Sequence, residues 1–243
     1  MSGAWNVADV VGLRDETPTA RTIRLRLPVP VRVLAGQHVD LRLTAPDGYQ
    51  AVRSYSVSAG IPPDGLEITV EELPDGEVSP YLVRDLGVGD QVEVRGPVGG
   101  WFVWRPEDDS PVQLIGGGSG VVPLMAMVRA HQMASHSSPL RLLYSVRSPE
   151  AAVFRHELES LAQASGTFGL QWVYTRTAPD GQPVGRLDAE TLGASVLDSG
   201  ADPAIFVCGA TGFVEAVAGW LVDLGHAPDR IKTERYGGLG GAS

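Results

Sequence analysis

The spacing of apolar residues along this chain changes near residues 105–111. That change constrains its fold more than any other feature of the sequence. Before it, apolar and polar residues alternate in short runs between turns rich in Pro, Gly and Asp. The clearest runs are residues 22–27, 38–43, 66–71 and 91–94. Alternation with a period of two is typical of antiparallel strands with one buried face. Several such strands at close spacing favour a β-barrel or a β-sandwich.

Beyond residue 111, continuously apolar runs alternate with helical patterns. The expected strands are residues 112–115, 140–144, 170–174 and 204–208. The expected helices lie near residues 121–134, 150–164, 188–197 and 211–224. Buried strands that alternate with helices indicate a doubly wound parallel sheet. We therefore expect two domains, residues 1–106 and 107–243.

Residue types that favour helix caps predict where two of the helices begin. A short helix is predicted over residues 79–86, with Ser79 as its N-cap and Pro80 at its first helical position. Thr211 is the expected N-cap of the helix that follows the last predicted strand.

Composition excludes several classes of protein. A hydrophobic content of 43% supports a full core, and no apolar stretch approaches the roughly 20 residues that a membrane-spanning helix needs. The first residues lack the pattern of a secretory signal, so we expect a cytoplasmic protein. The net charge of −10, with 18 Arg and one Lys, argues against nucleic-acid binding.

Cys208 is the only cysteine. A single cysteine cannot form an internal disulfide, and the chain alone cannot supply a four-cysteine iron-sulfur or zinc site. No metal site is predicted. Redox chemistry in this chain would depend on a bound organic cofactor.

The loop at residues 115–123 follows an expected strand and opens an expected helix. Its glycines allow a pyrophosphate to approach the backbone, and a helix N-terminus favours an anion. The spacing is not the dinucleotide fingerprint GxGxxG, because Val121 occupies the third glycine's place. The alternative is a purely structural glycine turn.

Arg53-Ser54-Tyr55-Ser56 lies on an expected strand of the first half. Arg53 is suited to a phosphate, Tyr55 to an aromatic ring and Ser56 to a ring nitrogen. The alternative is an ordinary half-buried strand with a surface arginine. The turn at residues 75–80 places a second anion-binding candidate, a helix N-terminus, in the same half.

The expected strand at residues 204–208 ends in a glycine turn at Cys208-Gly209. Ligands of open α/β sheets bind beyond the carboxyl ends of the strands, which is where these two residues fall. The alternative for Cys208 is a small hydrophobic core residue.

In order, the segments RSYS, DGEVSPYL, GPVGGWF, GGGSGVVPLMAM, VCGATGF and ERYGG resemble the ferredoxin-NADP(H) reductase family. The resemblance covers nearly the whole chain. It implies a six-stranded antiparallel β-barrel that binds flavin, followed by a doubly wound parallel sheet that binds NAD(P).

The resemblance also implies roles for single residues. In the barrel, Arg53 would contact the flavin phosphates, Tyr55 would stack on the flavin ring and Ser56 would lie near its reactive nitrogen N5. Further residues of the implied flavin site are Ser54, Thr69, Val70, Glu71, Gly76, Glu77, Val78 and Ser79. FAD is the expected flavin and FMN the alternative; no residue is identified that would stack on the adenine.

In the second domain, the dinucleotide would be held by Gly118, Ser119, Gly120, Val121, Cys208 and Gly209. Glu234 and Tyr236 match the family's C-terminal acidic and aromatic positions, where the aromatic ring covers the flavin until the nicotinamide displaces it. Ser56, Cys208, Glu234 and Tyr236 form the implied catalytic set. The chain continues past Tyr236 through residues 237–241, which suggests a looser cover.

The choice between NADPH and NADH depends on the group that receives the 2′-phosphate. Two candidate pairs follow expected strands, Ser145 with Arg147 and Thr175 with Arg176. They favour NADPH. The alternative is that both arginines are solvated or pair with Glu150 or Asp180.

The implied reaction is hydride transfer from NADPH or NADH to bound FAD, with electrons passed to a separate redox protein. A ferredoxin, a haem monooxygenase and a molybdenum enzyme are the candidate acceptors. A local patch of Arg21, Arg24, Arg26 and Arg32 is a candidate docking surface. Two alternatives are a free-flavin reductase and a non-catalytic electron-transfer or regulatory subunit.

Overall fold

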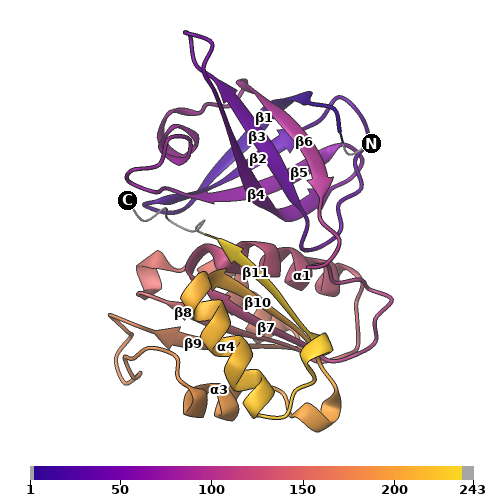
Figure 1. The fold of residues 1–243 in the computed structure, drawn as a ribbon, viewed down its shortest axis with the longest axis vertical. Helices are drawn as coiled ribbons and strands as arrows, with labels where there is room; N and C mark the ends of the chain where they lie inside the picture. The colour runs from indigo at the N-terminus through magenta and orange to yellow at the C-terminus, as the bar shows by residue number, and fades with distance from the viewer. Residues whose placement is uncertain (1–2, 237–243) are drawn as a thin grey trace. The chain divides into compact units, whose positions relative to one another are not determined.

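A computed structural model describes residues 3–236 of the chain. The chain divides into two compact units (Figure 1). The first comprises Met1–Arg105 together with Met125–Arg129, and the second comprises Pro106–Leu124 together with Ala130–Ser243. Each unit has a sheet and a hydrophobic core of its own.

The first unit is a closed antiparallel barrel with the strand order β1-β2-β5-β4-β3-β6. Its strands are β1 (Asn6–Thr17), β2 (Ala20–Arg26), β3 (His38–Thr44), β4 (Gln50–Ile61), β5 (Gly65–Glu71) and β6 (Gln91–Val98). The six-stranded barrel expected from the resemblance is confirmed. Closure leaves no strand edge unpaired, which removes a common route to aggregation.

The barrel interior is filled by the apolar residues of the alternating runs, such as Ile23, Leu41, Leu66 and Ile68. A single π-helical turn, η1 (Tyr81–Asp85), packs against β2 and β5. It follows the turn that contains Ser79. The Ser79 Oγ accepts a bond from the Leu73 amide at 3.0 Å, so the predicted N-cap was wrong.

The second unit is a five-stranded parallel sheet with helices on its faces (Figure 1). The strands are β7 (Val112–Gly117), β8 (Leu140–Val146), β9 (Phe168–Tyr174), β10 (Ala204–Ala210) and β11 (Ile231–Tyr236). The α-helices are α1 (Val121–Met133), α2 (Arg155–Ala164), α3 (Ala189–Ser195) and α4 (Thr211–Asp223). Short 3₁₀ turns are η2 (Gly118–Gly120), η3 (Pro149–Ala151), η4 (Ser199–Ala201) and η5 (Pro228–Arg230).

The sheet order β11-β10-β7-β8-β9 confirms the doubly wound topology. The chain moves outward from β7 in one direction and then outward from β10 in the other. The switch point therefore lies between β7 and β10, where open α/β sheets bind ligands beyond the carboxyl ends of their strands. Strand β11 was not predicted. Thr211 is the first residue of α4 and makes no cap bond, so its assignment as the N-cap was wrong.

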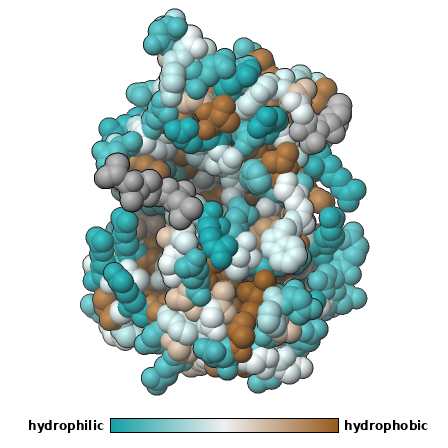
Figure 2. All heavy atoms as spheres, viewed as in Figure 1, coloured by the Kyte–Doolittle hydropathy of each residue, from teal (hydrophilic) through white to brown (hydrophobic). Residues whose placement is uncertain are grey.

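The surface of the described residues carries both hydrophobic and hydrophilic side chains. On the face drawn in Figure 2, hydrophobic residues form small separate groups among hydrophilic ones. None of the helices within residues 3–236 is long and apolar enough to cross a membrane.

Candidate functional site

Strand β4 presents its side chains alternately to two sides. Its register with β3 runs without interruption from Gln50 to Ser56, so Arg53 and Tyr55 share a side with the buried Ala51. Tyr55 is partly buried against the barrel core, and this burial raises the pKa of Tyr55 to about 12. A phenol with that pKa stays protonated and offers an intact aromatic face.

Ser54 lies on the opposite side of β4. Its Oγ donates a 2.6 Å bond to Asp40, which also accepts from Arg95 at 2.6 Å. Burial tends to raise the pKa of Asp40, but the bonds from Ser54 and Arg95 outweigh it and lower that pKa. The Ser54 side chain therefore belongs to a structural network in the barrel wall.

Arg53 is held by a carboxylate from outside its own strand. Its Nη2 donates a 2.7 Å bond to Glu77, and its Nη1 donates to the Val52 carbonyl at 2.8 Å. The Tyr49 hydroxyl donates to the same Glu77, which raises the pKa of Tyr49. Glu77 thus holds the guanidinium of Arg53 beside the turn that leads into η1.

The rest of the predicted flavin set divides into enclosed and accessible side chains. Thr69 and Val70 on β5 are buried, and the Thr69 hydroxyl bonds Thr22 at 2.8 Å and Ser58 at 3.2 Å. Val78 is buried as well, while Glu71 is only partly enclosed. Residues such as Thr69 and Val78 could meet a ligand only through their backbone.

The glycine turn after β7 packs closely against neighbouring strands. Gly118 has a φ of +56°, which disfavours any larger residue, and a Cβ there would lie 2.9 Å from the Tyr236 hydroxyl. A Cβ on Gly120 would lie 2.3 Å from the Cys208 carbonyl oxygen. Val121 is fully buried, so its side chain is not exposed to a ligand.

Cys208 and Gly209 lie at the carboxyl end of β10, between β7 and β11. Cys208 is registered with Gly116 on one side and with Glu234 on the other. Burial, and secondarily the charge of Glu234, raise the pKa of the Cys208 thiol. The thiol is therefore protonated at neutral pH.

Two further aromatic groups lie at the same place. The Tyr236 hydroxyl donates a 2.6 Å bond to the Gly117 carbonyl. The Phe213 ring packs on the backbone of Gly117 and Gly209, where an added Cβ would lie within 3.0 Å of its atoms. Sequence reasoning assigned no role to Phe213, although it directly follows the glycine turn of β10.

The predicted 2′-phosphate residues lie at the ends of adjacent strands. Ser145 is buried on β8 beside Gly117. The Arg176 amide donates to the Arg147 carbonyl at 3.0 Å, so the backbones of the two arginines lie side by side. Among residues 3–236 neither guanidinium has a carboxylate partner. Glu150, one of the two partners considered from the sequence, hydrogen-bonds Ser148 instead.

Two family models match this chain. Residues 10–103 match an oxidoreductase FAD-binding domain, and residues 114–219 match an oxidoreductase NAD-binding domain. The chain belongs to the ferredoxin-NADP(H) reductase family. Its first half is an FAD-binding domain, and its second half is an NAD-binding domain.

Two curated members of this family are reductase components. A glycine betaine monooxygenase reductase subunit from Chromohalobacter salexigens is 34% identical, over 97% of this chain and 65% of its own length. The reductase component of a naphthalene 1,2-dioxygenase/salicylate 5-hydroxylase system from Ralstonia sp. is 29% identical, over 93% of this chain and 67% of its own length. The chain thus spans about two thirds of these relatives.

A solved structure in the family has nearly the same extent as this chain. The FAD/NAD-binding domain of a nitric oxide dioxygenase from Vibrio cholerae is 26% identical, with a TM-score of 0.87. The alignment covers 96% of this chain and 98% of that one.

The residues present fit both cofactors of the reductase family. On the flavin side, Arg53 offers a guanidinium, and Gly76 packs so closely that a Cβ would lie 2.6 Å from the Ser79 Oγ. On the nicotinamide side, the turn at Gly118 and Gly120 leaves backbone where other residues would place side chains.

Proposed function

We propose that this chain is an electron-transfer reductase that oxidises NADPH through bound FAD and delivers electrons to a separate acceptor protein. The observation that carries this proposal is the presence of both cofactor domains in one chain, each with an accessible anion-binding group. These groups are Arg53 in the barrel, whose guanidinium is half-exposed and pairs with Glu77, and the turn at Gly118–Gly120 in the α/β unit. When bound, the flavin takes up a hydride from the reduced nicotinamide.

The chain's residues bind and orient the cofactors. Arg53 would neutralise the flavin phosphates, Tyr55 would pack on the flavin ring, and Ser56 would hydrogen-bond the flavin. In the α/β unit, the turn at Gly118–Gly120 receives the pyrophosphate of the dinucleotide. Cys208 and Glu234 flank the nicotinamide at the switch point.

The preference for NADPH rests on Arg147 and Arg176. The backbones of the two arginines lie side by side at the ends of β8 and β9, and neither guanidinium has a carboxylate partner among the described residues. A phosphate monoester would supply the missing anion.

The acceptor is inferred from the names of the relatives, which are reductase parts of monooxygenase and dioxygenase systems. We propose an oxygenase component, or a ferredoxin that serves one. The predicted docking patch receives little support, because Arg21, Arg24 and Arg26 each pair with a carboxylate in the barrel. Long-range attraction of an acidic partner to these residues is correspondingly weak.

The proposal predicts a yellow protein that retains flavin through gel filtration and is bleached anaerobically by NADPH. The isolated chain should also reduce an artificial one-electron acceptor. A protein that neither retains nor rebinds flavin would refute the proposal. Release of reduced flavin as a product would indicate a free-flavin reductase, and flavin retention without turnover would indicate a non-catalytic subunit.

A further inference from the structure

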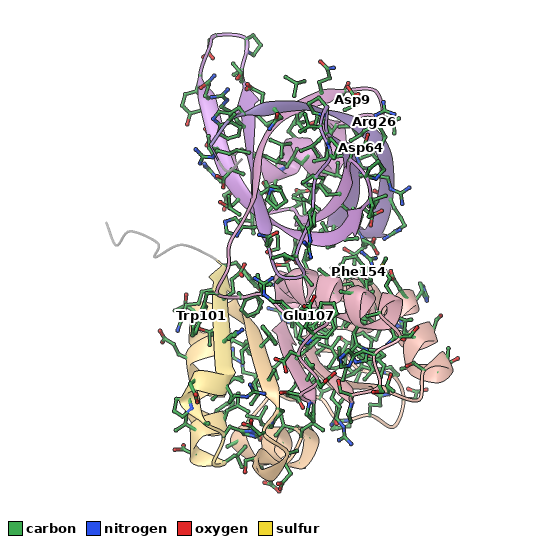
Figure 3. All side chains as sticks on the ribbon, turned by 90° about the vertical axis from the view of Figure 1, so that its right-hand side faces the viewer. Asp9, Arg26, Asp64, Trp101, Glu107 and Phe154 are labelled. Carbon is green, nitrogen blue, oxygen red and sulfur yellow. The ribbon has the colours of Figure 1, made fainter. Side chains whose placement is uncertain are left out.

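The loop that follows β6 carries a tryptophan that the barrel leaves exposed (Figure 3). Trp101 is 64% exposed, more than any other Trp, Tyr or Phe within residues 3–236. The next three residues, Phe102, Val103 and Trp104, are buried. A large apolar ring gains free energy when it leaves water, and tryptophan is among the residue types that dominate binding energy at protein interfaces. Trp101 is therefore a candidate anchor for a partner.

The backbone on both sides of Trp101 is fixed. Before it, the Gln37 side-chain amide donates to the Gly99 carbonyl at 3.0 Å. After it, the Trp104 amide donates to the Ala35 carbonyl at 3.1 Å. Ordering a loop on binding costs free energy, and a loop that is already fixed avoids most of that cost. The ring is therefore presented in a form that a partner can bind directly.

Two arginines beside this loop are not neutralised by a carboxylate. Arg105 directly follows Trp104. Arg32 lies three residues before Ala35, the bridge partner of Trp104. Both arginines are exposed, and within the described part of the chain neither has a carboxylate partner. The other arginines of the first unit each form an ion pair. The unpaired arginine charge of this unit is thus concentrated beside the exposed tryptophan.

The same loop lies near the strand proposed to hold the flavin ring. His38 is registered with Ser56 on one side and with Val98 on the other. A Cβ at Gly99 would lie 3.4 Å from the His38 Nδ1. Neighbouring strands are about 4.8 Å apart, so Gly99 lies roughly 10 Å from Ser56. A protein docked on this loop is therefore close to the proposed position of the flavin ring, as electron transfer requires.

We infer that Trp101, Arg105 and Arg32 form the docking surface for the acceptor protein; these three residues are called the Trp101 patch below. The inference rests on the proposed function and adds the chemistry of its partner, a protein with an apolar recess for the ring and carboxylates around that recess. The net charge of −10 disfavours long-range attraction of an acidic partner, so docking depends on local contacts with the patch.

The patch is small enough for one interface. An extended chain covers about 3.4 Å per residue, so Arg105 lies within about 14 Å of Trp101, and Arg32 lies within about 10 Å of Ala35. An interface of about 800 Å² per partner is roughly 30 Å across, which exceeds these spans. A single partner can therefore cover the ring and reach the charges around it.

The test uses the flavin-loaded full chain and an acidic plant-type [2Fe–2S] ferredoxin as the probe. Isothermal titration gives the dissociation constant without turnover. We expect Trp101→Ala to weaken binding about 30-fold or more, as the loss of an interface hot spot does. Trp101→Tyr keeps an aromatic ring and should bind better than the alanine variant. Arg105→Ala and Arg32→Ala should each weaken binding about 1.4- to 5-fold, as the loss of an exposed ion pair does.

Two matched variants control for exposure alone. Val88→Ala removes an apolar side chain of the barrel that is 65% exposed, and Arg26→Ala removes an arginine that is already paired with Asp9. Neither should change the dissociation constant. NADPH oxidation with benzoquinone, a small neutral acceptor that needs no docking surface, should be the same in all variants. This activity also shows that each variant is folded and holds its flavin. If Trp101→Ala fails that check, the charge-reversing Arg105→Glu provides the test and should weaken ferredoxin binding more than Arg105→Ala.

The outcomes distinguish this inference from the proposed function. If the unmodified chain does not oxidise NADPH with benzoquinone, the proposed function fails. If it does so but does not bind the ferredoxin, or if substitutions in the Trp101 patch leave ferredoxin binding unchanged, the docking surface is overturned while the reductase proposal stands. Weaker ferredoxin binding with unchanged benzoquinone turnover supports the inference.

Discussion

The Tyr236 hydroxyl donates a 2.6 Å hydrogen bond to the carbonyl of Gly117. Strand β11 brings this phenol across the sheet to the glycine turn that follows β7. A Cβ at Gly118 would lie 2.9 Å from the same hydroxyl. The phenol therefore lies over the turn proposed to receive the nicotinamide dinucleotide, and a ligand there competes with its bond.

We expect Tyr236→Phe to bind NADP⁺ more tightly. The substitution removes the hydrogen bond to Gly117 and keeps the ring. A neutral hydrogen bond contributes about 0.5–1.5 kcal/mol, so the dissociation constant should fall about 2- to 13-fold. Isothermal titration with the oxidised dinucleotide measures it without turnover. Thr233→Val on the same strand is the control, because its hydroxyl bonds Arg235. Weaker binding by Tyr236→Phe would show that the phenol assists the ligand.

Gly120→Ala should disrupt the switch point. The added Cβ would lie 2.3 Å from the Cys208 carbonyl oxygen and 2.8 Å from the Gly209 nitrogen, both of which are backbone atoms. Overpacking of this kind costs about 1–3 kcal/mol in the free energy of unfolding, which urea denaturation measures. Gly219→Ala is the matched control, because a Cβ there meets nothing within 4 Å on α4. It should be neutral or stabilising by up to about 1 kcal/mol. Equal stabilities would contradict the close approach.

Arg53→Ala should weaken FAD about 10- to 150-fold, because a charged hydrogen bond to a phosphate contributes about 1.5–3 kcal/mol. Flavin fluorescence titration measures the dissociation constant. The control is Arg26→Ala. Arg26 pairs with Asp9 elsewhere on the barrel (Figure 3), and the two side chains are 57% and 43% exposed, against 50% and 41% for Arg53 and Glu77. Equal effects of the two substitutions would show that Arg53 does not bind the flavin.

Arg176→Ala should reduce the preference for NADPH over NADH about 10- to 150-fold, through loss of a charged bond to the 2′-phosphate. Arg147→Ala should act in the same direction, because the backbones of the two arginines lie side by side. The ratio of kcat/KM for the two substrates measures the preference. An unchanged ratio in both variants would mean that the arginines are solvated surface groups.

Stability should fall as the pH decreases from about 6.5 toward 5. His131 and His226 are buried, and burial lowers the pKa of each below the ordinary value of 6.5. Between the folded and unfolded pKa values the unfolded chain binds more protons, so stability is complete above pH 6.5 and is lost below it. The slope is at most about 1.4 kcal/mol per pH unit for each histidine. Urea denaturation across this range measures it, and His131→Gln should flatten the profile. A flat profile for the unmodified chain would contradict the lowered pKa values.

The fold followed from periodicity because periodicity is local. Alternation in runs such as residues 66–71 indicated strands, although residues 65–70 of β5 are buried on both faces, and continuous apolar runs such as residues 204–208 indicated strands of a parallel sheet. Strand β11, Ile231–Tyr236, escaped this reasoning because its sequence IKTERY is mostly polar. It forms a strand through its parallel register with β10, which no local pattern encodes.

The two predicted helix N-caps were wrong for a related reason. Ser79 and Thr211 are residue types that cap helices, yet neither side chain forms a cap bond. The Ser79 hydroxyl meets the Leu73 amide instead, because the preceding turn folds back on itself. The glycines predicted to approach a pyrophosphate do lie in a tight turn between β7 and α1. The predicted tail beyond Tyr236, residues 237–241, lies outside the described residues.

By itself, the sequence determined the two folding units, their strand types and the residue types available for phosphates and aromatic rings. These depend on neighbours a few positions apart, so the pattern of side chains reveals them. Only the tertiary structure decided that Glu77 joins Arg53 to Tyr49 and that Tyr236 meets Gly117. Such contacts join residues distant in the chain, and they form only when barrel closure and sheet order bring their strands together.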